Sequence, residues 1–159
     1  TLDDIGISSS KIRNAIQNGE IKLANELLGY NYSLIGTVVR GLQNGRKLGF
    51  PTANIIVSNE HKLIPKTGIY AVRVHLPNAI YSTKIFSGML SIGYNPTFNR
   101  KEKTIEVNIL DFDKDIYGEL LTIEFIDYIR EEKKFDTVED LVEEIKNDEH
   151  KTKKILVAL

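Results

Sequence analysis

Hydrophobic and polar positions in the first thirty residues recur at the spacing of short helices. Ile12, Ala15 and Ile16 form an apolar stripe behind three serines, residues 8–10, that can cap a helix, and Gly19 can end it. A second helix is predicted over residues 20–28, closed by Gly29. Residues 1–30 are therefore predicted to form a helical segment.

Between residues 32 and 130 the pattern changes to that of strands. Ile105, Val107 and Ile109 fall on one face of an extended segment, and Glu106 and Asn108 fall on the other. Six segments are rich in β-branched and aromatic residues: 33–39, 53–57, 69–76, 84–92, 104–110 and 120–129. Because Gly, Pro and Asn turns separate them, the pattern predicts a small antiparallel barrel.

From residue 135 the period becomes helical again. Thr137 and Asp140 resemble a capping box at the start of a helix. Apolar residues follow at helix spacing: Val138, Leu141, Val142 and Ile145. The predicted fold class is therefore mainly β, a six-stranded antiparallel barrel with a C-terminal helix and a short helical N-terminal extension.

Composition narrows the function classes. The 159 residues suffice for one domain with a real core, and a hydrophobic share of 42% with a charged share of 27% is ordinary for a globular protein. A net charge of −1 argues against non-specific binding to nucleic acid. The chain has no cysteine, no apolar run of membrane-spanning length and no secretory signal, so we expect a cytoplasmic protein that binds no membrane. Its first residue is Thr1, which suggests a fragment of a longer chain.

The stretch 45–54 combines glycines, cations and small oxygen-bearing side chains. Glycines let the backbone approach a ligand closely, and Arg46 and Lys47 add positive charge where a phosphate would lie. Thr52 and Asn54 offer neutral oxygens suited to a hard cation such as Mg²⁺, and residues two apart in an extended segment point to the same side. The alternative is a glycine-rich hairpin with solvated cations.

Glu106 is the strongest candidate for a general base. It lies between Ile105 and Val107 in a predicted strand, a position where a charged side chain is uncommon unless it has a structural or functional role. A carboxylate on a rigid strand can accept a hydroxyl proton during phosphoryl transfer. The alternative is an outward-facing Glu on the wet side of a barrel.

Other candidates have weaker patterns. Arg130 and Lys133 could hold the edge of a flavin or a phosphate, or they could be surface charges. Residues 93–98 could form one side of a binding site for a flat ligand, or they could simply form a turn. His61, His75 and His150 lack metal-ligand spacing, so we interpret them as surface or structural residues.

Taken together, the motifs resemble the riboflavin kinase family, and in particular the kinase domain of the bacterial bifunctional riboflavin kinase/FMN adenylyltransferases (FAD synthetases). The matching stretches occur in the family's order: 36–41, 45–54, 68–70, 93–98, 105–112, 117–118 and 130–135. Residues 8–13 resemble the end of the adenylyltransferase domain of those enzymes, and the rest of that domain is not in this sequence. The resemblance divides the chain into a remnant, 1–30, and a kinase domain, 31–159.

The resemblance implies ATP-dependent phosphorylation of the riboflavin ribityl 5′-hydroxyl, with FMN and ADP as products and Mg²⁺ as the cofactor. Glu106 would be the catalytic base. The metal and nucleotide phosphates would be bound by Thr52, Asn54, Gly41 and Arg46. The nucleotide would be bordered by Ile109, Asp111, Tyr117 and Ile123. The flavin would be enclosed by Arg130, Lys133 and Val138.

Two positions depart from the family's pattern or leave it open. Position 108 is Asn where many relatives carry His, which leaves the polarity beside Glu106 undetermined, and the role of Lys47 is undefined.

Two other functions compete with the kinase. A flavin-storing barrel would bind flavin without nucleotide, and an oligonucleotide-binding barrel would need a basic aromatic face that the near-neutral charge disfavours.

Overall fold

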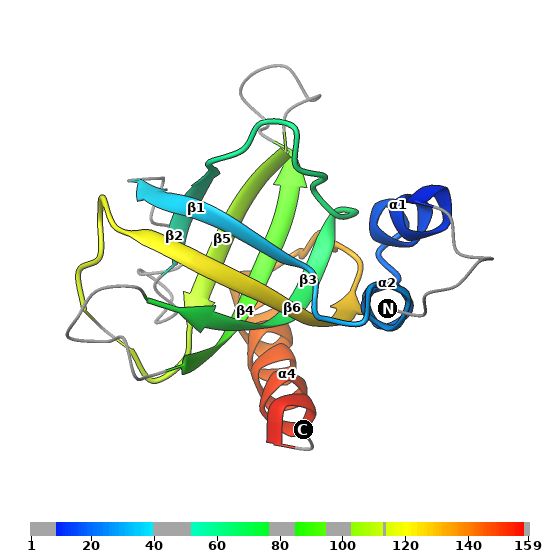
Figure 1. The fold of residues 1–159 in the computed structure, drawn as a ribbon. Helices are drawn as coiled ribbons and strands as arrows, with labels where there is room; N and C mark the ends of the chain where they lie inside the picture. The colour runs from blue at the N-terminus through cyan, green and yellow to red at the C-terminus, as the bar shows by residue number, and fades with distance from the viewer. Residues whose placement is uncertain (1–8, 40–51, 77–84, 95–102, 113, 158–159) are drawn as a thin grey trace.

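The computed structural model describes residues 9–39, 52–76, 85–94, 103–112 and 114–157 (Figure 1). Its elements are α1 (Ser9–Gln17), α2 (Ile21–Leu28), β1 (Ser33–Val39), β2 (Ala53–Val57), β3 (Gly68–His75), β4 (Ile85–Tyr94), β5 (Lys103–Ile109), β6 (Leu120–Arg130) and α4 (Val138–Val157). All six predicted strands are present. β1 and β2 have the predicted bounds, and the ends of the others differ by one or two residues.

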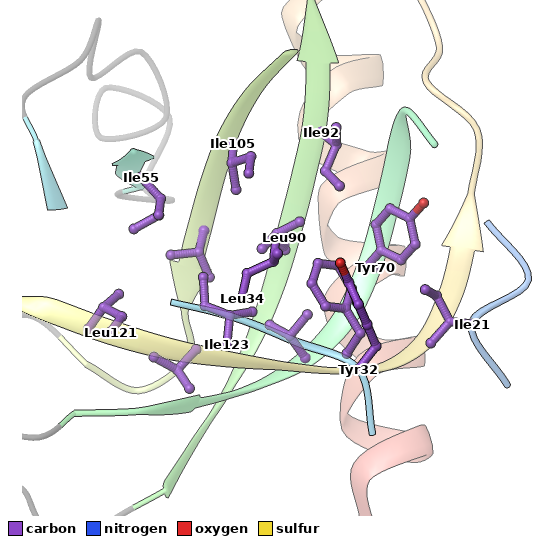
Figure 2. Close-up of a cluster of buried hydrophobic side chains, with 14 of the residues drawn as sticks. Ile21, Tyr32, Leu34, Ile55, Tyr70, Leu90, Ile92, Ile105, Leu121 and Ile123 are labelled. Carbon is purple, nitrogen blue, oxygen red and sulfur yellow. The ribbon is translucent and has the colours of Figure 1, made fainter. Parts of the chain in front are cut away.

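The six strands close into an antiparallel barrel in the order β1-β2-β5-β4-β3-β6, as predicted. Alternation along each strand explains the closure, because Ile105 and Val107 face inward while Glu106 faces outward. Figure 2 shows side chains filling the space between the strands. At its centre the rings of Tyr70 and Phe125 pack edge to face, with centroids 5.2 Å apart. The side chains of this cluster pack the barrel interior.

Helix α2 lies against β6, and α1 packs on α2 (Figure 1). Their inward residues, Ala15, Ile16, Ile21 and Ala24, belong to the same buried cluster as the barrel core. Gly29 ends α2 in the left-handed conformation, with φ at 83°, which confirms the predicted stop. The helical pair therefore shares the barrel's hydrophobic core.

Helix α4 packs on the outer face of β3, β4 and β6 and runs away from the barrel toward the C-terminus (Figure 1). Its start is as predicted, since the Thr137 hydroxyl accepts a hydrogen bond of 3.1 Å from the Asp140 N–H. The most buried residues of α4 are polar: Asp148 is 2% exposed and Thr152 is fully buried. Among the described residues, no helix combines the length and apolarity needed to cross a membrane.

Candidate active site

Asn54 and Glu106 face each other on neighbouring strands. They are register partners between β2 and β5, next to the inward pair of Ile55 and Ile105. Directly opposed residues of an antiparallel pair share a face of the sheet, so both polar side chains lie on the outer wall of the barrel. Thr52 precedes Asn54 by two residues and therefore lies toward the same side.

A cavity of about 620 Å³ lies between this outer wall and helix α4, and we call it the α4 cavity. Thr52, Glu106 and Asn108 line it from the barrel. Arg130 and the segment 132–135 border it from the end of β6, and α4 contributes Leu141, Ile145 and Asp148. The predicted base therefore faces a partly open cavity between barrel and helix.

A second cavity, of about 330 Å³, lies on the other side of Thr52, and we call it the Tyr117 cavity. Its lining is largely apolar and aromatic: Val38, Ala53, Val107, Ile109, Phe112, Ile116 and Tyr117, with Thr52, Lys114 and Asp115. The Tyr117 N–H donates a 3.0 Å hydrogen bond to the Asp115 carboxylate, which fixes the turn before β6. Because Thr52 lines both cavities, the two spaces meet at this residue.

Burial sets the acidity of Glu106. The side chain is half-buried, and the loss of solvation raises the pKa of its carboxyl above the ordinary value. A carboxylate with a raised pKa is a better proton acceptor at neutral pH than a solvated one. The proton affinity of Glu106 is therefore raised by its own surroundings.

The oxygens near Glu106 suit a hard cation. Within the described ranges, no three His, Cys, Asp or Glu side chains come together as a metal site. Thr52 and Asn54 provide a hydroxyl and an amide beside the carboxylate of Glu106. Mg²⁺ accepts such oxygens and completes its shell with water and substrate phosphates, so the donor set fits a nucleotide-bound magnesium ion.

Arg130 forms the far wall of the α4 cavity through an ion pair with Asp148. Its Nε donates to both carboxylate oxygens, at 2.9 and 3.1 Å, and its Nη2 donates to Oδ2 at 2.8 Å. Nη1 donates to the Glu131 carbonyl at 3.0 Å, and the guanidinium lies 5.9 Å from the ring centroid of Phe135. This bidentate pair fastens helix α4 to the end of β6.

Lys133 is paired with the same helix. Its Nζ lies 2.6 Å from Glu144 Oε1, which is also 3.6 Å from Arg130 Nε. The hydrogen bond from Lys133 lowers the pKa of the Glu144 carboxyl. Two cations from the 130–133 segment and two acids from α4 therefore form one network beside the cavity.

The family profile described as "Flavokinase: Riboflavin kinase" matches residues 28–156. The chain belongs to the riboflavin kinase family. It is 47% identical over 154 residues to a bifunctional riboflavin kinase/FMN adenylyltransferase from Listeria monocytogenes, covering 96% of this chain and 47% of that protein. The chain spans about half the length of the curated relatives that it matches first.

Two solved structures are similar to this fold. A macrolide-efflux protein from Streptococcus pneumoniae matches with a TM-score of 0.84 and 41% identity, over 92% of this chain and 46% of that one. A riboflavin kinase from Trypanosoma brucei matches with a TM-score of 0.54 and 29% identity, over 78% of each chain. The barrel of this riboflavin kinase domain is therefore shared across distant organisms.

Six of the ten predicted site residues that the structure describes line one or both of the two cavities. Thr52, Glu106, Arg130 and Lys133 line the α4 cavity. Thr52, Ile109 and Tyr117 line the Tyr117 cavity, and Asn54 faces Glu106 across the sheet.

Three other predicted residues line neither of these cavities. Asp111 adopts a left-handed conformation after β5, with φ at 56°. Ile123 is fully buried in the barrel core, and Val138 is 56% exposed at the start of α4. The predictions for Gly41 and Arg46 lie outside the described residues.

Sequence reasoning missed Asp148 and Glu144, the acids of α4 that pair with Arg130 and Lys133. Asp148 follows Leu141 and Ile145 by seven and three residues, so it lies on the same helix face as those apolar side chains. An acid at an apolar position of a helix face is uncommon without a partner, and this signal could have identified Asp148. Glu144 carried no such signal, because its neighbours on the helix surface are mixed in polarity.

Proposed function

We propose that this riboflavin kinase domain transfers the γ-phosphoryl group of ATP to the 5′-hydroxyl of riboflavin, producing FMN and ADP. One observation carries the proposal beyond family membership. Glu106, a half-buried carboxyl, lies directly opposite Asn54 and faces a cavity that meets a second cavity at Thr52. Phosphoryl transfer requires two substrates held end to end, with a base at the junction.

The two cavities suit the two substrates. Glu106 lines the α4 cavity, so riboflavin binds there with its ribityl chain directed at Glu106 and Thr52. The Tyr117 cavity offers an apolar and aromatic lining for the base of the nucleotide. The reacting phosphate then lies at the border that Thr52 forms.

In this arrangement, Glu106 accepts the proton of the riboflavin 5′-hydroxyl as the oxygen attacks the γ-phosphorus. A new P–O bond forms to the ribityl oxygen, and the bond between the γ-phosphorus and the β,γ-bridging oxygen breaks, so that ADP leaves with that electron pair. The raised pKa of Glu106 helps it to accept this proton near neutral pH. The residues of the site otherwise act by positioning the two substrates.

Thr52 and Asn54 would hold a magnesium ion through their side-chain oxygens. When bound, that ion neutralises charge on the nucleotide phosphates. Exchanging both side chains, Thr52→Ala with Asn54→Ala, is expected to weaken binding of ADP in the presence of Mg²⁺, measured by isothermal titration. An affinity equal to that of the unaltered protein would contradict this assignment.

The activity itself is tested directly. Purified protein supplied with riboflavin, ATP and Mg²⁺ is expected to form FMN, separated and quantified by chromatography. Absence of FMN across several divalent metals and pH values would refute the kinase. A flavin-storing barrel would bind riboflavin in the same assay without converting ATP to ADP. Release of ADP therefore distinguishes the two functions.

We also propose that in the intact protein this domain follows an FMN adenylyltransferase domain, with residues 1–30 as the end of that domain and its linker. The Listeria relative carries both activities in its name and has about twice the matched length, which supports the proposal. Formation of FAD from riboflavin and ATP by the full gene product is the expected result. Accumulation of FMN alone would contradict it.

A further inference from the structure

The positive charges at the far wall of the α4 cavity are matched by acids from helix α4. Asp148 holds Arg130 by three hydrogen bonds, and Glu144 holds Lys133 at 2.6 Å. Arg130 and Asp148 are nearly inaccessible to solvent, with side chains 11% and 3% exposed. In such surroundings the two opposite charges of a pair largely cancel at the cavity surface.

The charged groups that line the cavity in the described part of the chain support this conclusion. The cations that line it are Arg130, Lys133 and Lys134, and the acids that line it are Glu106, Glu132 and Asp148. Glu144 adds a fourth acid through its contact with Lys133. Among the described residues, the lining therefore carries no excess of positive charge, although two Lys and one Arg contribute to it. A phosphate would gain little from entering this space.

The ion pairs also fix where the guanidinium points. Contacts to Asp148 and Glu131 use three of its five N–H bonds, on Nε, Nη1 and Nη2. Two N–H bonds remain that these contacts do not use. A guanidinium held in one orientation, with its charge already balanced, is suited to donate hydrogen bonds to carbonyl oxygens of an uncharged ring.

We propose that Asp148 and Glu144 determine specificity in the α4 cavity: by holding Arg130 and Lys133 in neutral pairs, they make its wall accept an uncharged flavin ring and reject phosphate-bearing groups. This inference rests on the proposed function, which places riboflavin in this cavity. It adds that the acids of α4 prevent phosphate groups from competing for the flavin's place.

The experiment is a riboflavin titration followed by quenching of flavin fluorescence, with and without inorganic phosphate at constant ionic strength. The unaltered protein is expected to bind riboflavin equally well in both. In Asp148→Asn and Glu144→Gln, an unbalanced cation remains, and phosphate is expected to raise the apparent riboflavin Kd at least about threefold. Asp148→Asn should also weaken riboflavin binding without phosphate by about tenfold, because Arg130 loses its orientation.

Glu149→Gln is the matched control. It removes one negative charge from the same helix, but Glu149 pairs with Lys153 rather than with the cavity cations. Phosphate is expected to leave its riboflavin affinity unchanged. The inference would be overturned if phosphate raised the apparent riboflavin Kd equally in Glu144→Gln and Glu149→Gln. It would also be overturned if phosphate changed this Kd in no folded variant.

Two further outcomes remain distinguishable. If Asp148→Asn fails to fold, judged by its thermal transition, Glu144→Gln alone decides, because it leaves the Arg130–Asp148 pair in place. Because the titration measures binding rather than turnover, a protein that binds riboflavin but makes no FMN would refute the proposed kinase. The result on phosphate competition would still stand.

Discussion

At the scale of single residues, the site depends on where Glu106 sits. Its strand neighbours, Ile105 and Val107, are buried in the barrel, so the carboxyl is held on a rigid backbone at the outer wall. Asn54 lies directly opposite on β2, and Glu106 lines the α4 cavity together with residues of α4. The surroundings of Glu106 are therefore supplied by three separate parts of the chain.

We expect Glu106→Gln to lower kcat by at least about a hundredfold, because an amide cannot accept the hydroxyl proton. The amide has nearly the same shape, so the affinity for ADP with Mg²⁺ should be retained. Single-turnover FMN formation and an ADP titration check the two parts. Turnover near that of the unaltered protein would remove Glu106 from the role of base.

The same substitution is expected to stabilise the fold at neutral pH. Burial raises the pKa of Glu106 in the folded state, so the folded protein holds this proton more tightly than the unfolded chain does. Stability contributed by the neutral form is present below the unfolded value, about 4.3, and is lost as the pH rises through the folded pKa. In Glu106→Gln the side chain does not ionise, so this loss of stability with rising pH does not occur.

Urea unfolding at several pH values measures this effect. The stability advantage of Glu106→Gln over the unaltered protein should be largest at neutral pH and should shrink as the pH falls toward 4. Glu60→Gln is the control, since the Glu60 side chain is 88% exposed. An advantage that is independent of pH would contradict the burial argument.

Sequence alone could place Glu106 on the outer face but could not show what covers it. Alternation of Ile105, Val107 and Ile109 identifies the inward face of the strand from its own residues. The covering helix α4 begins more than thirty residues later, and its docking depends on the pair of Arg130 and Asp148. Such long-range pairs leave no periodic signal in the sequence.

At the scale of elements, the side chain of Asn25 joins α2 to the barrel through two backbone groups. Asn25 donates to the Phe125 carbonyl at 2.9 Å and accepts a 2.7 Å hydrogen bond from the Tyr32 N–H. The Tyr32 N–H lies between α2 and β1, and the Phe125 carbonyl lies within β6. Asn25 therefore links the helical pair to the barrel by hydrogen bonds as well as by the shared core.

Asn25→Ala is expected to destabilise the protein by about 1–3 kcal/mol, because two partly buried backbone groups lose their partner. Lys22→Ala on the same helix is the control. Its ion pair with Asp127 is largely exposed on the lysine side, so its loss should cost less than about 1 kcal/mol. Urea unfolding of both variants makes the comparison, and equal losses would contradict the linking role of Asn25.

The elements themselves were largely predictable from the sequence. Six alternating segments and three helical periods appear at the expected places because burial on one face imposes a period on the residues that form it. The sequence did not reveal that α1 and α2 share the core of the barrel. Ile16 and Ile21 look the same in a separate helical hairpin as in a domain core.

At the scale of the whole molecule, the two cavities are separate spaces with one shared border residue, Thr52. Under the proposed function, nucleotide and flavin would occupy the domain at the same time. Phosphoryl transfer would then pass directly between substrates, without a phosphorylated enzyme.

Initial rates measured at several fixed riboflavin concentrations are expected to give intersecting double-reciprocal lines against ATP. ADP with Mg²⁺ should also bind to protein already saturated with riboflavin. Parallel lines, or mutually exclusive binding of ADP and riboflavin, would show that the two cavities do not act as neighbouring substrate sites.

The pairing of β2 with β5 carries a consequence for how such sequences can change. Side chains on a strand alternate, so inserting or deleting a single residue within Ala53–Val57 or Lys103–Ile109 would turn Asn54 or Glu106 toward the core and bring an isoleucine or valine out in its place. A substitution there alters one side chain, whereas a change of length reverses the facing of every residue that follows it in the strand. Among descendants of a common ancestor, gaps in an alignment should therefore fall outside these two strands wherever the enzyme still makes FMN.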